Sequence, residues 1–239
     1  MNKIDVNLAT DIKVLKRIAK RKRYNIFDDN SKPFNLNIWG IRNRNLKAGY
    51  FDDLLVVFWK ENNGAWTVVS FEVTTDPSDI SLINFRNNLG TAIITEAQHR
   101  GVWQLGLHKG QYEALVQRRP ITVIRDFNKD GILDIPSNEL LDKWKYEKVV
   151  IDLSNRTTER FEIDGVLKYI RDTGYFGINC HRASKYNILE KIGLYSEGCV
   201  VFKNPVAFES SFMVLINNAV ANWGNSFTFT LCNEKELYL

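Results

Sequence analysis

The stretch LLVVFWK at residues 54–60, followed by ENNG at 61–64 and AWTVVSFEVTT at 65–75, decides the fold class. Apolar and β-branched residues fill both long runs, as in strands that pack on a core. Asn63 and Gly64 supply the Asn-Gly pair that favours a tight connection between two strands. The sequence therefore predicts an antiparallel hairpin here and a β-rich fold around it.

Further strand-like runs lie on both sides of this hairpin. FNLNIWGIR at 34–42 alternates apolar and polar residues, as a half-buried strand does. Shorter apolar runs, separated by glycines and by a proline, lie at 91–94, 102–107, 115–117, 121–125 and 226–232. We therefore expect a β-rich α+β fold.

Basic residues are concentrated in one expected helix near the start of the chain. The net charge is +4, and lysines and arginines crowd residues 13–23. Apolar residues recur there at helical spacing and would face a core; they are Leu8, Ile12, Leu15 and Ala19. The basic face is then either solvated, which we favour, or turned toward an anionic partner. Nucleic acid is therefore not the expected partner.

The chain divides into an N-terminal segment with the basic helix and a polar connection, residues 1–33, and one domain at 34–239. A single large domain is expected because 239 residues can bury a substantial core. Within it, Asn204 followed by Pro205 predicts the cap and first residue of a C-terminal helix. The charged residues 136–173 indicate a peripheral insertion.

Three cysteines make thiol chemistry available to this chain. An odd number without CxxC spacing argues against a disulfide scaffold and against a structural zinc site. Cys180 and His181 are neighbours on an expected strand, so Cys180 would face the core and His181 the opposite side. Cys232 lies in an alternating apolar strand, which indicates packing.

Cys199 is the remaining thiol, and it is either a buried packing residue, as free cysteines commonly are, or a nucleophile. It follows Gly198 in YSEGCVVF, where a turn before a strand can aim the backbone amides of both residues at an oxyanion. Catalysis by cysteine proceeds through the thiolate, so we expect a lowered pKa for Cys199.

The order of these residues resembles the signature of the L,D-transpeptidase (YkuD-type) catalytic domain, a histidine followed after a loop by Ser-His-Gly-Cys. His181 and the SEGC run at 196–199 carry this resemblance, which extends loosely over 52–204. It implies a β-sandwich core, Cys199 as nucleophile and His181 as base. It also implies that the backbone carbonyl of Arg182 orients the base.

Four segments, GLHKGQYEALVQ, TVIRDFNKDGILD, GINCHRAS and SEGCVVF, are similar to uncharacterised proteins of tailed phages of gut Bacteroidota (crAss-like). Together the resemblances imply an endolysin-like hydrolase or transpeptidase of the peptidoglycan stem peptide, acting through a Cys-His thioester without a required cofactor. The alternative is a non-catalytic virion or host-interaction protein that retains the fold.

Neither a signal peptide nor a membrane span is expected. The start of the chain has no apolar run, and no stretch approaches about 18 consecutive apolar residues. A phage protein of this kind would be soluble in the host cytoplasm and then released to the periplasm by other proteins, or carried in the virion. The sequence leaves its oligomeric state open.

Five side chains are expected on the substrate side of the site. Ser196 and Glu197 precede the nucleophile, and Glu197 stands where the family has a second histidine. His108 and Tyr112 cluster in LGLHKGQY, where the strand register could bring the histidine to the mouth of the site; a satisfied surface histidine is the alternative. Arg42 could hold a carboxylate of the stem peptide in a bidentate pair.

A candidate metal loop lies in DFNKDGILD at 126–134. Oxygen-bearing side chains occupy positions 1, 3, 5 and 9 of a calcium loop and a glycine occupies position 6; the four are Asp126, Asn128, Asp130 and Asp134. The closing glutamate of position 12 is missing, and strands rather than helices flank the loop. A structural Ca²⁺ and a plain Asp-rich turn both remain open.

Overall fold

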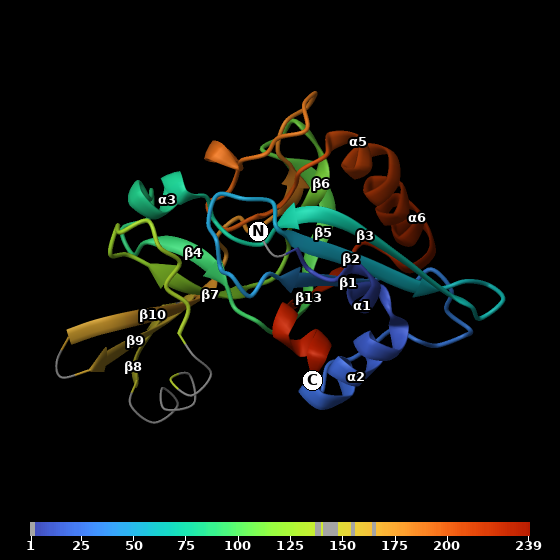
Figure 1. The fold of residues 1–239 in the computed structure, drawn as a ribbon, viewed down its shortest axis with the longest axis horizontal. Helices are drawn as coiled ribbons and strands as arrows, with labels where there is room; N and C mark the ends of the chain where they lie inside the picture. Colours follow the sequence, from blue (N-terminus) through green and yellow to red (C-terminus); the bar gives the residue numbers. More distant parts are fainter. Residues whose placement is uncertain (1–2, 137–139, 141–147, 154–155, 164–165) are drawn as a thin grey trace.

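The predicted hairpin is present in the computed structural model, which describes residues 3–136, 140, 148–153, 156–163 and 166–239 (Figure 1). β2 (Asp53–Lys60) and β3 (Trp66–Thr74) pair antiparallel in unbroken register from Asp53 opposite Val73 to Lys60 opposite Trp66. The turn between them contains Gly64 at φ +79°, a conformation that glycine adopts without strain.

Eight strands close into a barrel, in the order β1-β13-β5-β6-β11-β12-β3-β2. Besides β2 and β3 they are β1 (Asn37–Arg42), β5 (Gln98–His108), β6 (Tyr112–Gln117), β11 (Cys180–Arg182), β12 (Val200–Phe202) and β13 (Phe227–Asn233). The resemblance predicted a β-sandwich, and the strand pairing corrects this. β1 pairs with β2 on one side and, in parallel, with the C-terminal β13 on the other, so no open edge is left between them.

The inside of the barrel is filled by large apolar side chains. Trp103 stacks on Phe229 with ring centroids 4.4 Å apart, and the indole N–H donates to the carbonyl of Ile178 at 2.9 Å. Phe202 contacts both Phe208 and Phe212 from the helical segment that covers one side of the barrel. Packing of this kind fixes the positions of the short strands β11 and β12.

The predicted C-terminal helix is confirmed. It runs through α5 (Pro205–Ala207), a π-helical turn η2 (Phe208–Phe212) and α6 (Met213–Trp223). The Asn204 side chain caps it by accepting from the amides of Val206 and Ala207 at 2.9 and 3.3 Å. Among the described residues, none of the helices combines the length and the apolar content that crossing a membrane requires.

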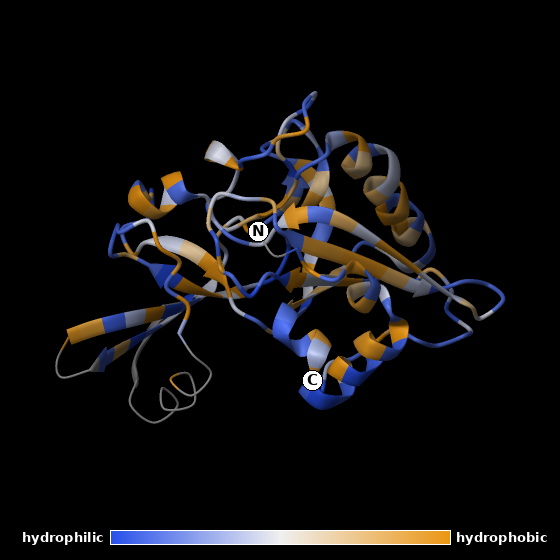
Figure 2. Ribbon diagram, viewed as in Figure 1, coloured by the Kyte–Doolittle hydropathy of each residue, from blue (hydrophilic) through white to orange (hydrophobic). Residues whose placement is uncertain are grey.

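The basic helix is also present, as α1 (Val6–Thr10) and α2 (Ile12–Lys22). Its apolar face packs outside the barrel against β1 and β2, and Figure 2 shows apolar and polar residues alternating along it. Part of its charge binds the C-terminal turn η3 (Glu234–Tyr238): Arg17 donates to the Leu237 carbonyl at 2.7 Å, and Lys22 lies 2.7 Å from Glu236.

A second sheet of five strands adjoins the barrel, in the order β4-β7-β10-β9-β8. The strands are β4 (Thr91–Ile94), β7 (Ile121–Asp126), β8 (Lys148–Leu153), β9 (Arg156–Ile163) and β10 (Val166–Gly174). The segment 136–173 was expected to be peripheral, and this is corrected: β10 pairs with β7, and Asp172 at its end is fully buried. Residues 137–139 and 141–147 of that segment lie outside the described part of the chain.

Candidate active site

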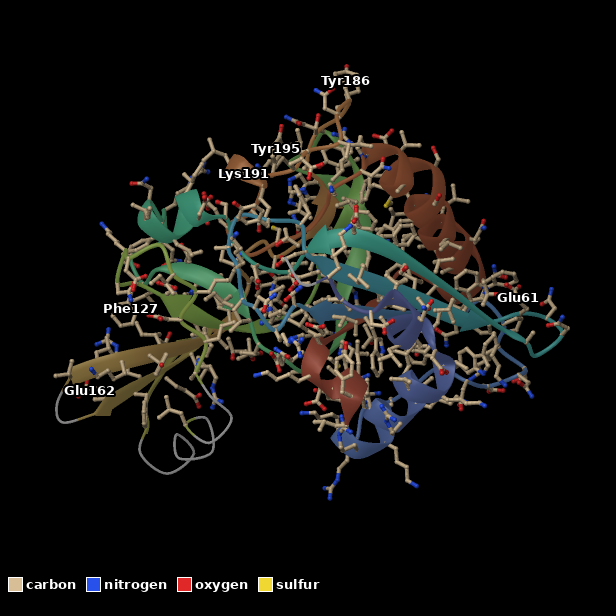
Figure 3. All side chains as sticks on the ribbon, in the orientation of Figure 1. Glu61, Phe127, Glu162, Tyr186, Lys191 and Tyr195 are labelled. Carbon is tan, nitrogen blue, oxygen red and sulfur yellow. The ribbon has the colours of Figure 1, made fainter. Side chains whose placement is uncertain are left out.

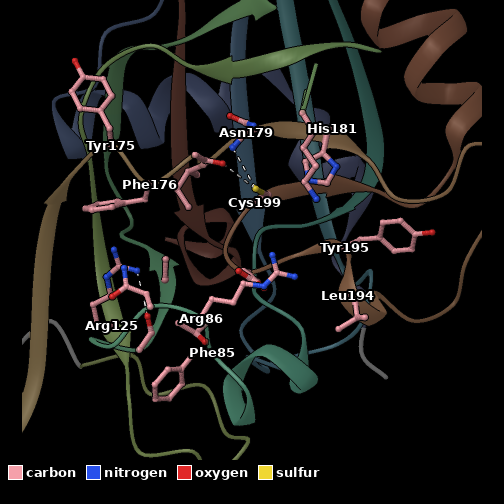
Figure 4. Close-up of a pocket in the computed structure, with 18 of the residues that line it drawn as sticks. Phe85, Arg86, Arg125, Tyr175, Phe176, Asn179, His181, Leu194, Tyr195 and Cys199 are labelled. Atoms are coloured by element: carbon pink, nitrogen blue, oxygen red, sulfur yellow. Dashed lines mark hydrogen bonds and ion pairs between the residues drawn. The ribbon is translucent and has the colours of Figure 1, made fainter. Parts of the chain in front are cut away.

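Cys199 and His181 line one pocket of about 790 Å³ where the barrel meets the second sheet (Figure 4). β11 and β12 run parallel with Cys180 opposite Val200 and His181 opposite Val201, so Cys199, the residue before β12, lies next to Asn179, the residue before β11. The loop that joins these two strands carries Tyr186 and Tyr195 to the top of the molecule as drawn in Figure 3.

The His181 ring is oriented by a backbone carbonyl. Its Nδ1 lies 2.8 Å from the carbonyl oxygen of Arg182, which also accepts from the Tyr112 hydroxyl at 3.2 Å. A carbonyl oxygen can only accept, so Nδ1 carries the proton and Nε2 keeps its lone pair. The Arg182 carbonyl thus lies where the resemblance places the third partner of the site, and His181 holds the tautomer that a base requires.

A second histidine lies against the first. The rings of His108 and His181 stack with centroids 4.0 Å apart, and His108 Nδ1 lies 3.1 Å from the Asn179 side-chain nitrogen. Burial lowers the pKa of His181 to about 3, with the neighbouring His108 as a further cause. The pKa of His108 is lowered to about 4, mainly by burial and to a smaller extent by the charge of nearby Lys109. Both rings are therefore neutral at neutral pH.

The Cys199 thiol is half-buried and is held by two backbone groups. The amide of Asn179 donates to its sulfur at 3.4 Å, and the thiol donates to the carbonyl of Gly177 at 3.4 Å. Burial raises the pKa of Cys199 to about 11, which outweighs the lowering by the Asn179 amide and by Lys109. The expected low pKa is therefore wrong: desolvation penalises the thiolate, and the pocket holds a neutral thiol and a neutral imidazole.

The turn before Cys199 is fixed by Ser196 and Gly198. Gly198 has φ +119°, and a Cβ there would lie 2.4 Å from the carbonyl oxygen of Ala92, so only glycine fits. Its amide donates to the Ser196 hydroxyl at 3.2 Å, and that hydroxyl lies 3.0 Å from the Asp76 carbonyl. Two expectations are corrected: Ser196 is buried and shapes the turn instead of touching substrate, and the Gly198 amide is already engaged instead of facing an oxyanion.

Arg42 was expected to bind substrate, and its position corrects this. It is fully buried and lies 2.8 Å from the Asp76 carboxylate. Its other donors contact the carbonyls of Ile94 and Thr75 at 2.9 and 3.1 Å. A guanidinium so enclosed cannot be reached by a ligand, and its contribution is to fix the segment on which Ser196 rests.

The remaining substrate candidates divide into two groups. His108 and Glu197 line the pocket, and Glu197 lies 3.0 Å from Arg86 at its rim. Tyr112 does not line it, which corrects that expectation: its hydroxyl donates to the Arg182 carbonyl that orients His181. The Arg182 side chain lies over the Tyr112 ring at 4.0 Å and pairs with Glu209 at 2.8 Å.

Sequence reasoning missed several residues that shape this pocket. Asn179 connects its parts: its amide contacts the Cys199 sulfur, and its side chain contacts His108 and the Gln117 amide. A signal for it was present, because strand alternation places Asn179 on the same face as His181. Lys109, Arg125 and Arg156 also line the pocket, and nothing in the local sequence marked the two arginines.

The candidate calcium loop forms a hydrogen-bonded turn. The Asn128 side chain donates to the carboxylates of Asp130 and Asp134 at 2.9 and 2.7 Å, and Asp126 accepts from the Asp134 amide at 3.1 Å. These contacts belong to an Asp-rich turn. Within the described residues, no group of three or more His, Cys, Asp or Glu side chains is arranged to hold a metal ion.

No family model, curated protein or solved structure matches this chain. The chemistry of the pocket therefore rests on the geometry of its own residues.

Proposed function

We propose that this chain is a cysteine-dependent hydrolase or transpeptidase of peptidoglycan stem peptides, with an L,D-transpeptidase-like arrangement of catalytic groups. One observation carries the proposal: the Arg182 carbonyl holds His181 with Nδ1 protonated and Nε2 unprotonated, in the same pocket as the Cys199 thiol. A nucleophile, a base and a group that orients the base are the three parts that acyl transfer by cysteine requires.

The reaction begins from the neutral pair. His181 Nε2 takes the thiol proton as the Cys199 sulfur attacks the carbonyl carbon of the scissile amide. The tetrahedral intermediate then collapses, the carbon–nitrogen bond breaks, and the imidazolium returns its proton to the leaving amine. This leaves a thioester on Cys199 and neutral His181.

The second half repeats these steps with a new nucleophile. His181 removes a proton from water, or from an acceptor amine, as that group attacks the thioester carbonyl. Collapse expels the Cys199 sulfur, which takes the proton back from the imidazolium. Water gives hydrolysis and a stem amine gives a crosslink, so access of each to the open pocket decides the product.

The test is product analysis by mass spectrometry on muropeptides that contain diaminopimelate. Native protein is expected to remove a terminal residue from the stem or to change a crosslink, and Cys199→Ala is expected to do neither. Cys232→Ala is the matched control, because this thiol is buried on the far side of the barrel wall, against the N-terminal helix. Turnover by Cys199→Ala, or none by native protein, contradicts the proposal.

A non-catalytic binding protein is the second candidate, and two observations favour it. Burial raises the pKa of Cys199 to about 11, which suits a thiol that stays protonated. Exposed apolar side chains surround the pocket mouth, among them Tyr175, Leu194 and Tyr195. This candidate predicts that muropeptides bind equally well to native protein and to Cys199→Ala, as measured by calorimetry, and that neither protein changes them.

A further inference from the structure

Two arginines at one side of the pocket share a single carboxylate. Arg125 Nε lies 2.9 Å from one oxygen of Asp172, and Arg156 Nε lies 2.7 Å from the other. Asp172 is fully buried and also accepts from the Thr158 hydroxyl at 3.2 Å. Two guanidiniums against one carboxylate leave one positive charge in excess, and guanidinium stays protonated at any working pH.

The two guanidiniums are fixed in place by an aromatic ring. They lie over the face of Phe176, with Arg125 at 4.4 Å and Arg156 at 5.7 Å from the ring centroid. The Phe176 amide donates to the Gln117 side chain at 2.9 Å, which anchors the ring on β6. The side chain of Arg156 is 29% exposed, so it can still meet a ligand, and its contacts to Asp172 use Nε and Nη2 but not Nη1.

The other charged groups of the pocket add to this excess. Four cationic side chains line it, Arg86, Lys109, Arg125 and Arg156, whereas Glu197 is the acidic residue among the described lining. Glu197 is paired with Arg86, and Lys109 makes no ion pair with a described residue. With Asp172 counted, the site retains about two positive charges in a concave space, where field lines from the low-dielectric walls are focused.

Arg125 lies on the side of Cys199 away from His181 (Figure 4), and Arg156 is held next to it by their shared partner Asp172. During acylation His181 must reach the leaving amine to protonate it, so the leaving group lies on the histidine side, toward Tyr195. The acyl group stays bonded to the sulfur and extends the other way, past Gly177 and Phe176.

We infer that the pocket selects acyl donors that carry a carboxylate in the acyl part, held by Arg156 with Arg125 behind it. Guanidinium binds carboxylate through paired N–H donors, and the concave setting strengthens this contact. The inference rests on the proposed function insofar as Cys199 is the nucleophile, but it does not depend on a cell-wall substrate.

Two alkylating probes test it, N-bromoacetyl-glutamic acid and its uncharged diamide, which differ in charge while sharing the reactive group. The rate at which each probe alkylates Cys199 is followed by mass spectrometry at pH 9. The ratio of the rate with the acid to the rate with the diamide is then divided by the same ratio measured on N-acetylcysteine, a free thiol. Native protein should favour the acid about tenfold. Arg156→Gln, which leaves Asp172 paired with Arg125, should abolish the preference. Arg171→Gln, which removes a guanidinium that pairs with Glu159 on the same sheet, should retain it.

Equal ratios for native protein and free thiol overturn the inference, as does a preference that survives Arg156→Gln. Failure of both probes to alkylate Cys199 overturns it too, since it removes the nucleophile. The muropeptide assay separates this result from the proposed function. An Arg156-dependent preference without muropeptide turnover rejects the cell-wall substrate alone, whereas turnover without a preference rejects the anion subsite alone.

Discussion

The imidazole rings of His108 and His181 stack with centroids 4.0 Å apart and planes inclined by 23°. Burial lowers the pKa of both, to about 4 for His108 and about 3 for His181. Since protonating either ring places a charge against its neighbour in a poorly solvated space, the stacked pair stays neutral down to acidic pH. His181 is therefore available as a base over a wider pH range than a solvated histidine.

The pH profile of kcat/KM should show no acidic limb near the ordinary histidine pKa of about 6.5. The folded-state pKa of His181 lies near 3, so the neutral base is retained as the pH falls from 8 to 5. Initial rates on a muropeptide substrate across that range would measure this. A midpoint between 6 and 7 would contradict it.

Removing the His108 ring should bring the pKa of His181 closer to the ordinary value for histidine. In His108→Ala, water reaches His181 and the neighbouring imidazole is lost, so the pKa of His181 should rise and an acidic limb should appear above pH 5. His108→Phe keeps an aromatic ring in the stack and is the matched control, with its profile expected to remain flat. Identical profiles for the two variants would show that stacking does not set the pKa.

The Cys199 thiol should react slowly with iodoacetamide at neutral pH. Burial raises its pKa to about 11, so the thiolate fraction, and with it the alkylation rate, should grow about tenfold per pH unit between pH 7 and 9. Peptide mapping after timed alkylation gives the rate at each thiol. A rate at Cys199 that is independent of pH in this range would indicate a preformed thiolate.

Gly198→Ala should abolish activity and destabilise the protein. The residue has φ +119°, and the new Cβ would lie 2.4 Å from the Ala92 carbonyl oxygen, so backbone strain alone costs about 1–3 kcal/mol. Gly193→Ala is the control, because Gly193 also has positive φ but meets nothing within 4 Å. Urea denaturation and the muropeptide assay measure both effects. Equal loss in the two variants would show that the close approach at Ala92 is unimportant.

Arg42→Gln should lower the free energy of unfolding by about 3–5 kcal/mol, because it leaves the buried Asp76 carboxylate without its guanidinium. Arg44→Gln removes an exposed guanidinium 3.7 Å from Glu234 and should cost at most about 1 kcal/mol. Thermal unfolding of both variants gives the comparison. Similar losses would mean that the Arg42–Asp76 pair does not support the segment under Ser196.

Local features of the fold were predictable from the sequence, whereas closure of the barrel by strands that are distant in the sequence was not. The hairpin and the Asn204 cap follow from neighbouring residues, and strand alternation correctly set His181 apart from Cys180. Pairing of β1 with β13 joins segments nearly the whole chain apart, and no local pattern specifies it. Burial of Arg42 likewise depends on the segments that pack around it. Arginine is a residue type that commonly binds carboxylates, but here the side chain is part of the protein interior.

Electrostatics in the site were the least predictable from sequence. The family resemblance suggested Cys199 and His181 as a pair, and the two line one pocket, but the pKa of each is set mainly by desolvation, which only the packed structure determines. Arg125 of β7 and Arg156 of β9 reach the pocket because the second sheet adjoins the barrel. The sequence was interpreted as having a peripheral insertion at 136–173, and that interpretation placed Arg156 away from the site.

The most direct test of the central claim is to trap the thioester. Native protein is mixed with a diaminopimelate-containing tetrapeptide stem, quenched in acid, and mapped by mass spectrometry. The account predicts an acyl adduct on Cys199, absent in Cys199→Ala and in His181→Asn. An adduct on Cys180 or Cys232, or product formation by the native protein without any adduct on Cys199 at early times, would contradict it.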